Sequence, residues 1–172
     1  MNNKNYTPGF NPPFFPMFLA TGFGSGFFPY GPGTAGSVVA LLIWLVLLHW
    51  LSVGVLTVLT LVLVALFTLV GTWATAKVQP FWGDDPSRVV VDEMVGMWMA
   101  LLAAPLFTAG QQLVLGLVAL VLFRFFDIVK PLGIKRLDRR QGAFWVMADD
   151  LLGGFYALLI LCVAGIILNF SS

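Results

Sequence analysis

The chain has 172 residues and a formal net charge of +1; hydrophobic residues make up 59% of it and charged residues only 10%. This composition lies outside the range of soluble domains and predicts a membrane protein, while the near-zero net charge gives no reason to expect nucleic acid as a partner. One cysteine and one histidine exclude a disulfide framework, a Cys/His zinc site and an iron–sulfur cluster, so any metal must be held by oxygen, which favours Mg²⁺ or Mn²⁺.

The amino-terminal part combines a short apolar segment with a glycine-rich stretch. We expect a tail over residues 1–13 without a cleaved signal peptide, and a short interfacial helix over residues 14–20. Residues 22–37 (GFGSGFFPYGPGTAGS) hold too many glycines and prolines for a regular span and predict a re-entrant or surface loop. Its backbone N–H groups and hydroxyls suit a phosphate, although its glycines are equally suited to close packing.

Five apolar runs follow this stretch, and each predicts a membrane span. They cover residues 38–51, 53–76, 89–107, 113–128 and 148–168. Because the first two are short or closely spaced, the prediction is an all-α polytopic membrane bundle of about four to five spans, forming a single domain over residues 14–170. Lysines and arginines gather in alternate connections, which places those connections, Lys4 and the glycine-rich stretch in the cytoplasm and the NFSS tail outside.

Paired acids lie at the edges of two of these runs. Asp92 and Glu93 open the third run, and Asp149 and Asp150 open the fifth. A carboxylate near the hydrocarbon core costs several kcal/mol, so acids at such places usually have a function. A second interpretation stays open, because the helix macrodipole also favours acids at a helix start. Gly96 shares a helix face with Asp92 and predicts a close neighbour there.

A third charged motif, FRFFDIVKP, holds Arg124, Asp127 and Lys130 at a spacing of three residues, so all three can share one helix face. Asp127 either neutralises its basic neighbours or helps to bind metal or phosphate. The next cluster, IKRLDRR, is interpreted as a topology signal that touches anionic lipid headgroups. Carboxylates for a hard cation, two basic residues for phosphate and backbone donors at a helix start together indicate metal-assisted phosphoryl chemistry at a membrane surface.

These motifs, with ADDLLGG, occur in an order over residues 20–154 that resembles the A-type phosphatidylglycerophosphatase family. The resemblance implies a Mg²⁺-dependent enzyme of the bacterial inner membrane, with a cytoplasmic site, that hydrolyses phosphatidylglycerophosphate to phosphatidylglycerol and phosphate. It implies catalytic and metal-binding roles for Asp92, Glu93, Asp127, Asp149 and Asp150. It implies phosphate binding by Arg124, Lys130, Gly24, Ser25, Gly33, Thr34 and Ser37. The chain departs from the family pattern at Leu132–Gly133, where a second proline often follows Pro131, and at Gly153, where alanine is common.

The mechanism expected on this basis is hydrolysis of a terminal phosphate monoester, with one or two Mg²⁺ ions held by the carboxylates and a water that attacks in line. Asp92 or Asp149 as a covalent nucleophile is the alternative. An ion-coupled transporter, the rival of another class, would show inverted repeats and acids near the bilayer midplane, and the sequence shows neither. A CDP-alcohol phosphotransferase would carry a long spaced aspartate–glycine signature, which the chain lacks.

Overall fold

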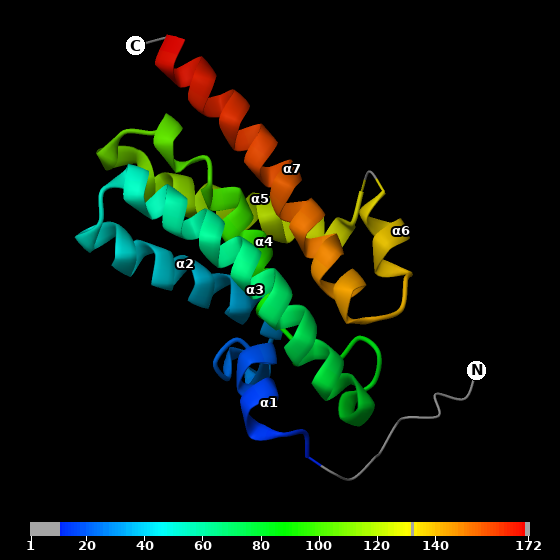
Figure 1. The fold of residues 1–172 in the computed structure, drawn as a ribbon. Coiled ribbons are helices and arrows are strands. Elements are labelled where there is room, and N and C mark those ends of the chain that lie inside the picture. Colours follow the sequence, from blue (N-terminus) through cyan, green and yellow to red (C-terminus); the bar gives the residue numbers. More distant parts are fainter. Residues whose placement is uncertain (1–10, 132, 171–172) are drawn as a thin grey trace.

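The computed structural model describes residues 11–131 and 133–170, and over these ranges it is helical without strands (Figure 1). The helices are α1 (Phe14–Ala20), α2 (Pro32–Trp50), α3 (Val53–Trp82), α4 (Val91–Leu101), α5 (Gln112–Val129), α6 (Ile134–Asp138) and α7 (Ala143–Phe170). Three short 3-10 turns are η1 (Ser25–Phe27), η2 (Ala104–Leu106) and η3 (Ala109–Gln111). The predicted all-α bundle is confirmed. Most of the predicted tail, including Lys4, and the last two residues of NFSS lie outside the described residues.

Four of the helical segments are long and apolar enough to cross a membrane, in agreement with the predicted four to five. They are Pro32–Trp50, Val53–Trp82, Ala109–Val129 and Ala143–Phe170. At 30 residues, α3 is about 45 Å long, whereas the hydrocarbon core of a bilayer is about 30 Å thick. We therefore expect α3 to tilt or to extend beyond the hydrocarbon. The last of the four begins five residues earlier than predicted, so Asp149 and Asp150 lie in its second turn rather than at its start.

The prediction that residues 89–107 form a membrane span is wrong. The chain there makes α4, a helix of 11 residues that is too short to cross a bilayer alone, and then the turn η2. Nine of the 11 residues are buried, because α4 is surrounded by α2, α3, α5 and α7. A helix that is apolar on all sides suits a protein interior as well as it suits lipid. Hydropathy alone could not distinguish these two surroundings.

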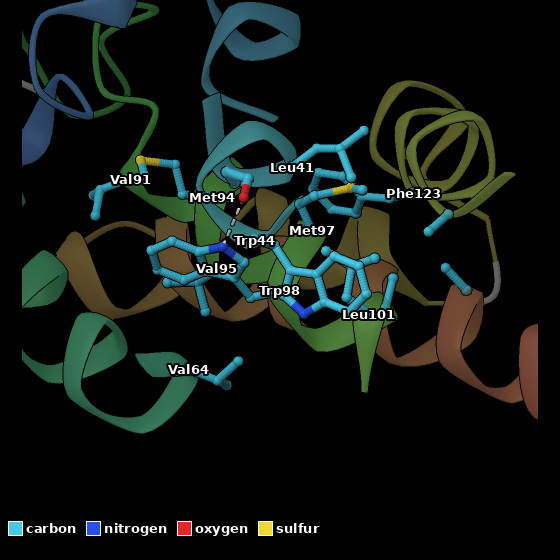
Figure 2. Close-up of a cluster of buried hydrophobic side chains, with 14 of the residues drawn as sticks. Leu41, Trp44, Val64, Val91, Met94, Val95, Met97, Trp98, Leu101 and Phe123 are labelled. Carbon is cyan, nitrogen blue, oxygen red and sulfur yellow. Dashed lines mark hydrogen bonds between the residues drawn. The ribbon is translucent and has the colours of Figure 1, made fainter. Parts of the chain in front are cut away.

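The hydrophobic core is built around α4 (Figure 2). Trp98 of α4 donates its indole N–H to the carbonyl oxygen of Ala40 on α2 at 3.0 Å, and its ring lies 5.1 Å from that of Phe67 on α3. Trp44 and Phe123 pack in the same cluster with at most 1% of their surfaces exposed. These contacts fix α4 against both helices of the α2–α3 hairpin and against α5.

The backbones of α4 and α7 touch where two glycines face each other. A Cβ atom on Gly154 would lie 2.2 Å from the carbonyl oxygen of Gly96, and a Cβ atom on Gly96 would lie 2.3 Å from the ring of Phe123. The predicted close approach at Gly96 is thus confirmed. Because Gly96 follows Asp92 by four residues and Gly154 follows Asp150 by four, this crossing sets the separation of the two acids.

The helix directions place the charged motifs at one end of the bundle (Figure 1). At the other end, Asn169, near the end of α7, donates a hydrogen bond to the carbonyl oxygen of Leu106 in η2 at 3.0 Å. The starts of α4 and α7 and the end of α5 consequently meet at the end that also holds α6 and the connection between α3 and α4. The residues at that end line the pocket described below.

Candidate metal and phosphate site

A pocket of about 290 Å³ lies where these helix ends meet. It is lined by residues from the α3–α4 connection, the start of α4, the end of α5, the α6–α7 connection and the start of α7. The chain contains eight acidic residues, and all of them line this pocket. They are Asp84, Asp85, Asp92, Glu93, Asp127, Asp138, Asp149 and Asp150. The basic residues in the lining are only Lys130, Arg139 and Arg140, so the pocket has a large excess of negative charge.

Three of the acids form a cluster that suits a metal ion. One carboxylate oxygen each from Asp92, Glu93 and Asp150 lie within 4.8 Å of one another. Among the described residues, the buried Oδ1 of Asp92 and Oε2 of Glu93 have no hydrogen-bond partner. Buried carboxylate oxygens without partners are costly, and neighbouring like charges add repulsion. A hard divalent cation such as Mg²⁺ or Mn²⁺ would relieve both costs, so the oxygen donors fit the predicted metal.

The start of α4 is held in place by the glycine-rich part of the chain. The backbone N–H of Val90 donates to the carbonyl oxygen of Ala20 at 2.9 Å, which ties the first turn of α4 to the end of α1. Gly33, in the first turn of α2, lies so close to Glu93 that a Cβ atom there would be 2.1 Å from Oε1 of Glu93. Glu93 is therefore near the starts of two helices, where partial positive charge favours a carboxylate.

Arg124 lies behind the carboxylates rather than in the pocket lining. Its Nη1 is 2.7 Å from Oδ2 of Asp127, one helical turn along α5, and 3.9 Å from Oε1 of Glu93. The ion pair between Arg124 and Asp127 supports the first of the two interpretations of Asp127. Because Asp127 also lines the pocket, the pair leaves it in position to contact a ligand.

Lys130 joins α5, α6 and α7. It ends α5 in a left-handed conformation with φ of 48°, and its Nζ donates to Oδ2 of Asp149 at 2.7 Å and to Oδ1 of Asp138. Burial lowers the pKa of Lys130, but the hydrogen bonds to Asp138 and Asp149 raise it more, so the net shift of the pKa is upward. Lys130 is therefore an ammonium group at the edge of the pocket, paired with an acid on either side.

The structure places all five predicted phosphate-binding residues of the glycine-rich stretch outside the pocket lining. Ser37 is buried and donates to the carbonyl oxygen of Gly33 at 2.9 Å, and Ser25 donates to that of Gly22 at 2.9 Å, so both hydroxyls bond within their own turns. Gly24 and Thr34 do not line the pocket either. The close contact of Gly33 with Glu93 supports the packing role that was left open for the glycines. Phosphate binding by this stretch stays a prediction.

Several pocket residues were missed in the sequence. Asp84, Asp85 and Ser87 come from the α3–α4 connection, and the α6–α7 side adds Asp138, Arg139, Arg140, Gln141 and Trp145. The sequence interpretation gave the two arginines a role in topology and in contact with anionic lipid headgroups, but not in the pocket. The sequence did contain a signal for these residues. All eight acidic residues fall in the connections and helix ends of one side of the predicted bundle, so a polar site had few other places to form.

The family model described as Phosphatidylglycerophosphatase A matches residues 18–165 of the chain. The chain belongs to this family. The match includes all of the pocket residues, and the predicted class of enzyme, a phosphatase, is confirmed by it and by two relatives of the same name.

Three relatives show how far the similarity extends. A protein of Bacteroides thetaiotaomicron named "Putative phosphatidylinositol-3-phosphatase" is 48% identical over 89% of this chain and 95% of its own length. Proteins named "Phosphatidylglycerophosphatase A" are 37% identical in Haemophilus influenzae, over 83% of both chains, and 34% identical in Escherichia coli, over 86% of this chain and 81% of the relative. No solved structure matches the chain.

Proposed function

We propose that the protein is a Mg²⁺-dependent lipid phosphatase that hydrolyses phosphatidylglycerophosphate to phosphatidylglycerol and inorganic phosphate. The observation that carries the proposal is the cluster of Asp92, Glu93 and Asp150 inside a pocket lined by every acid of the chain. Family membership and the four helical segments that are long and apolar enough to cross a membrane support a lipid substrate. We further propose, from the positive-inside pattern and the bacterial relatives, that the pocket faces the cytoplasm from the inner membrane.

A second substrate is favoured by one observation. The relative with 48% identity is named for an activity on phosphatidylinositol 3-phosphate rather than on phosphatidylglycerophosphate. Both lipids carry a terminal phosphate monoester on a polyol that a phosphodiester joins to diacylglycerol. The acidic cluster would treat the two monoesters alike, so the part of the pocket beyond the cluster would have to select between them.

In the proposed mechanism, Asp92, Glu93 and Asp150 would hold Mg²⁺ in the pocket. A bound Mg²⁺ supplies positive charge for the phosphoryl oxygens and activates a water molecule. Lys130 offers a further positive charge at the pocket edge, and its pairing with Asp149 fixes the ammonium group in place. Arg124 holds Asp127 toward the pocket and partly offsets the negative charge of Glu93. Phosphate contacts from the glycine-rich stretch remain part of the proposal.

The test is phosphate release by purified protein in neutral detergent, with phosphatidylglycerophosphate as substrate, after treatment with EDTA and after addition of Mg²⁺. We expect EDTA to abolish turnover, Mg²⁺ to restore it, and Asp92→Asn and Asp150→Asn each to lower it by about 100-fold or more, since each removes a metal ligand. A parallel measurement of the unfolding temperature should show Mg²⁺ stabilising the wild type but neither variant. Wild-type turnover and wild-type Mg²⁺ stabilisation in both variants would refute the metal role.

Substrate choice is tested with the same assay on phosphatidylinositol 3-phosphate and on glycerol 3-phosphate. We expect one of the two diester-linked lipids to give the highest kcat/KM. If glycerol 3-phosphate were hydrolysed as efficiently as either lipid, the proposal of a lipid phosphatase would be wrong, although the metal site would stand.

A further inference from the structure

Two arginines in the pocket lining are not used by the proposed mechanism. Arg139 and Arg140 lie in the connection between α6 and α7, and both line the pocket together with all eight acids. Within the described ranges, neither forms a salt bridge, whereas Lys130 pairs with two carboxylates and Arg124 with two others. Their guanidinium groups are therefore available to an anionic ligand that enters the pocket.

Arg140 is also held in a defined place. Its Cζ lies 4.2 Å from the centre of the Trp145 ring, within the range of a cation–π interaction. Trp145 is in the first turn of α7 and lines the pocket, and it precedes Asp149 by four residues, so the two share one face of the helix. The rise of an α-helix separates Trp145 from Asp149 by about 6 Å along α7, with Trp145 nearer the start of the helix. Arg140, which stacks on Trp145, is thus placed about one helical turn from Asp149 along α7.

This separation corresponds to a feature of the substrates. In both candidate lipids a polyol lies between the terminal phosphate monoester and the phosphodiester that carries the diacylglycerol. If the monoester reaches the acidic cluster, the diester must stay about one polyol unit away, toward the mouth. The two arginines line the same pocket from the connection that precedes α7, about one helical turn from Asp149.

We propose that Arg139 and Arg140 form a second anion subsite, which binds the phosphodiester of the substrate and makes the enzyme prefer diester-linked lipid phosphates to phosphatidic acid. The inference rests on the proposed function. Phosphatidic acid is the informative comparison, because it has the acyl chains and the phosphate monoester but lacks the phosphodiester. Trp145 acts as a positioning residue that holds Arg140 at the subsite.

The test compares kcat and KM on phosphatidylglycerophosphate and on phosphatidic acid, both in neutral detergent micelles, for the wild type, Arg139→Ala and Arg140→Ala. Loss of a charge-assisted hydrogen bond should raise KM for phosphatidylglycerophosphate by about 10-fold, while kcat/KM for phosphatidic acid changes less than about 2-fold. Arg136→Ala is the matched control, because Arg136 is exposed in the same basic segment but does not line the pocket. Trp145→Leu should reproduce the effect of Arg140→Ala.

The outcomes separate this inference from the proposed function. If both lipids lost the same activity in Arg139→Ala and Arg140→Ala, or if Arg136→Ala had the same effect, the arginines would act only by general attraction to anionic lipid and the subsite would be refuted. Binding of short-chain phosphatidylglycerol, which has a diester but no monoester, tests the subsite without turnover. It should weaken about 10-fold in Arg140→Ala and not in Arg136→Ala. If the wild type hydrolysed neither lipid yet showed this binding pattern, the proposed function would fail and the subsite would stand.

Discussion

The contact between α4 and α7 allows a sharp prediction at two adjacent glycines. In Gly154→Ala the new methyl group would meet the carbonyl oxygen, carbonyl carbon and Cα of Gly96 at 2.2, 2.8 and 2.9 Å. All three are backbone atoms, so no side chain can rotate away. In Gly153→Ala the nearest atom would be the Cβ of Phe126 at 3.6 Å, which is an ordinary van der Waals contact. The two substitutions change helix propensity equally and differ only in this contact.

The magnitude follows from these distances. Relieving a 2.2 Å contact to an ordinary one requires α4 and α7 to move apart by about 1 Å, and overpacking of this kind costs about 1–3 kcal/mol. The same movement separates Asp150 from Asp92 and Glu93, whose ligand oxygens now lie within 4.8 Å of one another. Because a misplacement of about 1 Å in a reacting site costs about 100-fold in rate, Gly154→Ala should lose activity as well as stability.

The assay is phosphate release in saturating Mg²⁺, with the free energy of unfolding measured by denaturant titration in detergent. Gly153→Ala should keep wild-type turnover and gain up to about 1 kcal/mol of stability, as alanine replaces glycine inside a helix. If Gly154→Ala kept both the turnover and the stability of Gly153→Ala, the close crossing would not control the site, and the placement of Asp150 against Asp92 would need another explanation.

Three further predictions concern the charges and the core. Lys130→Met should lower turnover by about 10-fold to 100-fold, because it leaves Asp149 unpaired beside the pocket, while Lys130→Arg should keep most of the activity; phosphate release measures both. EDTA should lower the unfolding temperature of the wild type, and Mg²⁺ at 100 times its Kd should restore about 2.7 kcal/mol, as calorimetry can check. Trp98→Phe should cost about 0.5–1.5 kcal/mol in denaturant titration through the lost hydrogen bond to Ala40, and an unchanged KM would show that the loss is structural.

The sequence predicted that Asp92, Glu93, Asp127, Asp149 and Asp150 gather at one end of the bundle, and all five line the pocket there. Long apolar runs and the positive-inside pattern were enough to bring the starts of two acid-bearing helices together. The small residue at Gly96 correctly indicated a close neighbour, and at Gly153 the structure has room for a methyl group, since the nearest atom would lie 3.6 Å away. Predictions about which residues share a helix face could be made from the sequence, because they depend on helix periodicity alone.

The rest depended on contacts between distant segments. Hydropathy could not show that α4 is enclosed by other helices rather than by lipid, and this enclosure is what buries Asp92. The spacing of Lys130 along α5 suggested a pairing with Asp127, but its ammonium group instead bonds Asp138 and Asp149, because α5 ends at Lys130 in a left-handed turn. Which partner a long basic side chain selects is decided by the loop that follows it, and periodicity carries no information about that loop.

The structure also bears on the alternative that the acids only complement helix dipoles. That alternative concerned the two acid pairs and places both in the first turns of their helices, yet the first turn of α7 contains no acid. Asp127 and Asp138 lie instead near the carboxyl ends of their helices, where the dipole disfavours negative charge. Only Asp92 and Glu93 occupy the favourable position. The macrodipole therefore does not explain the positions of Asp127 and Asp138, which Arg124 and Lys130 offset, and the cluster of Asp92, Glu93 and Asp150 is the part of the pocket that the proposed cation would offset.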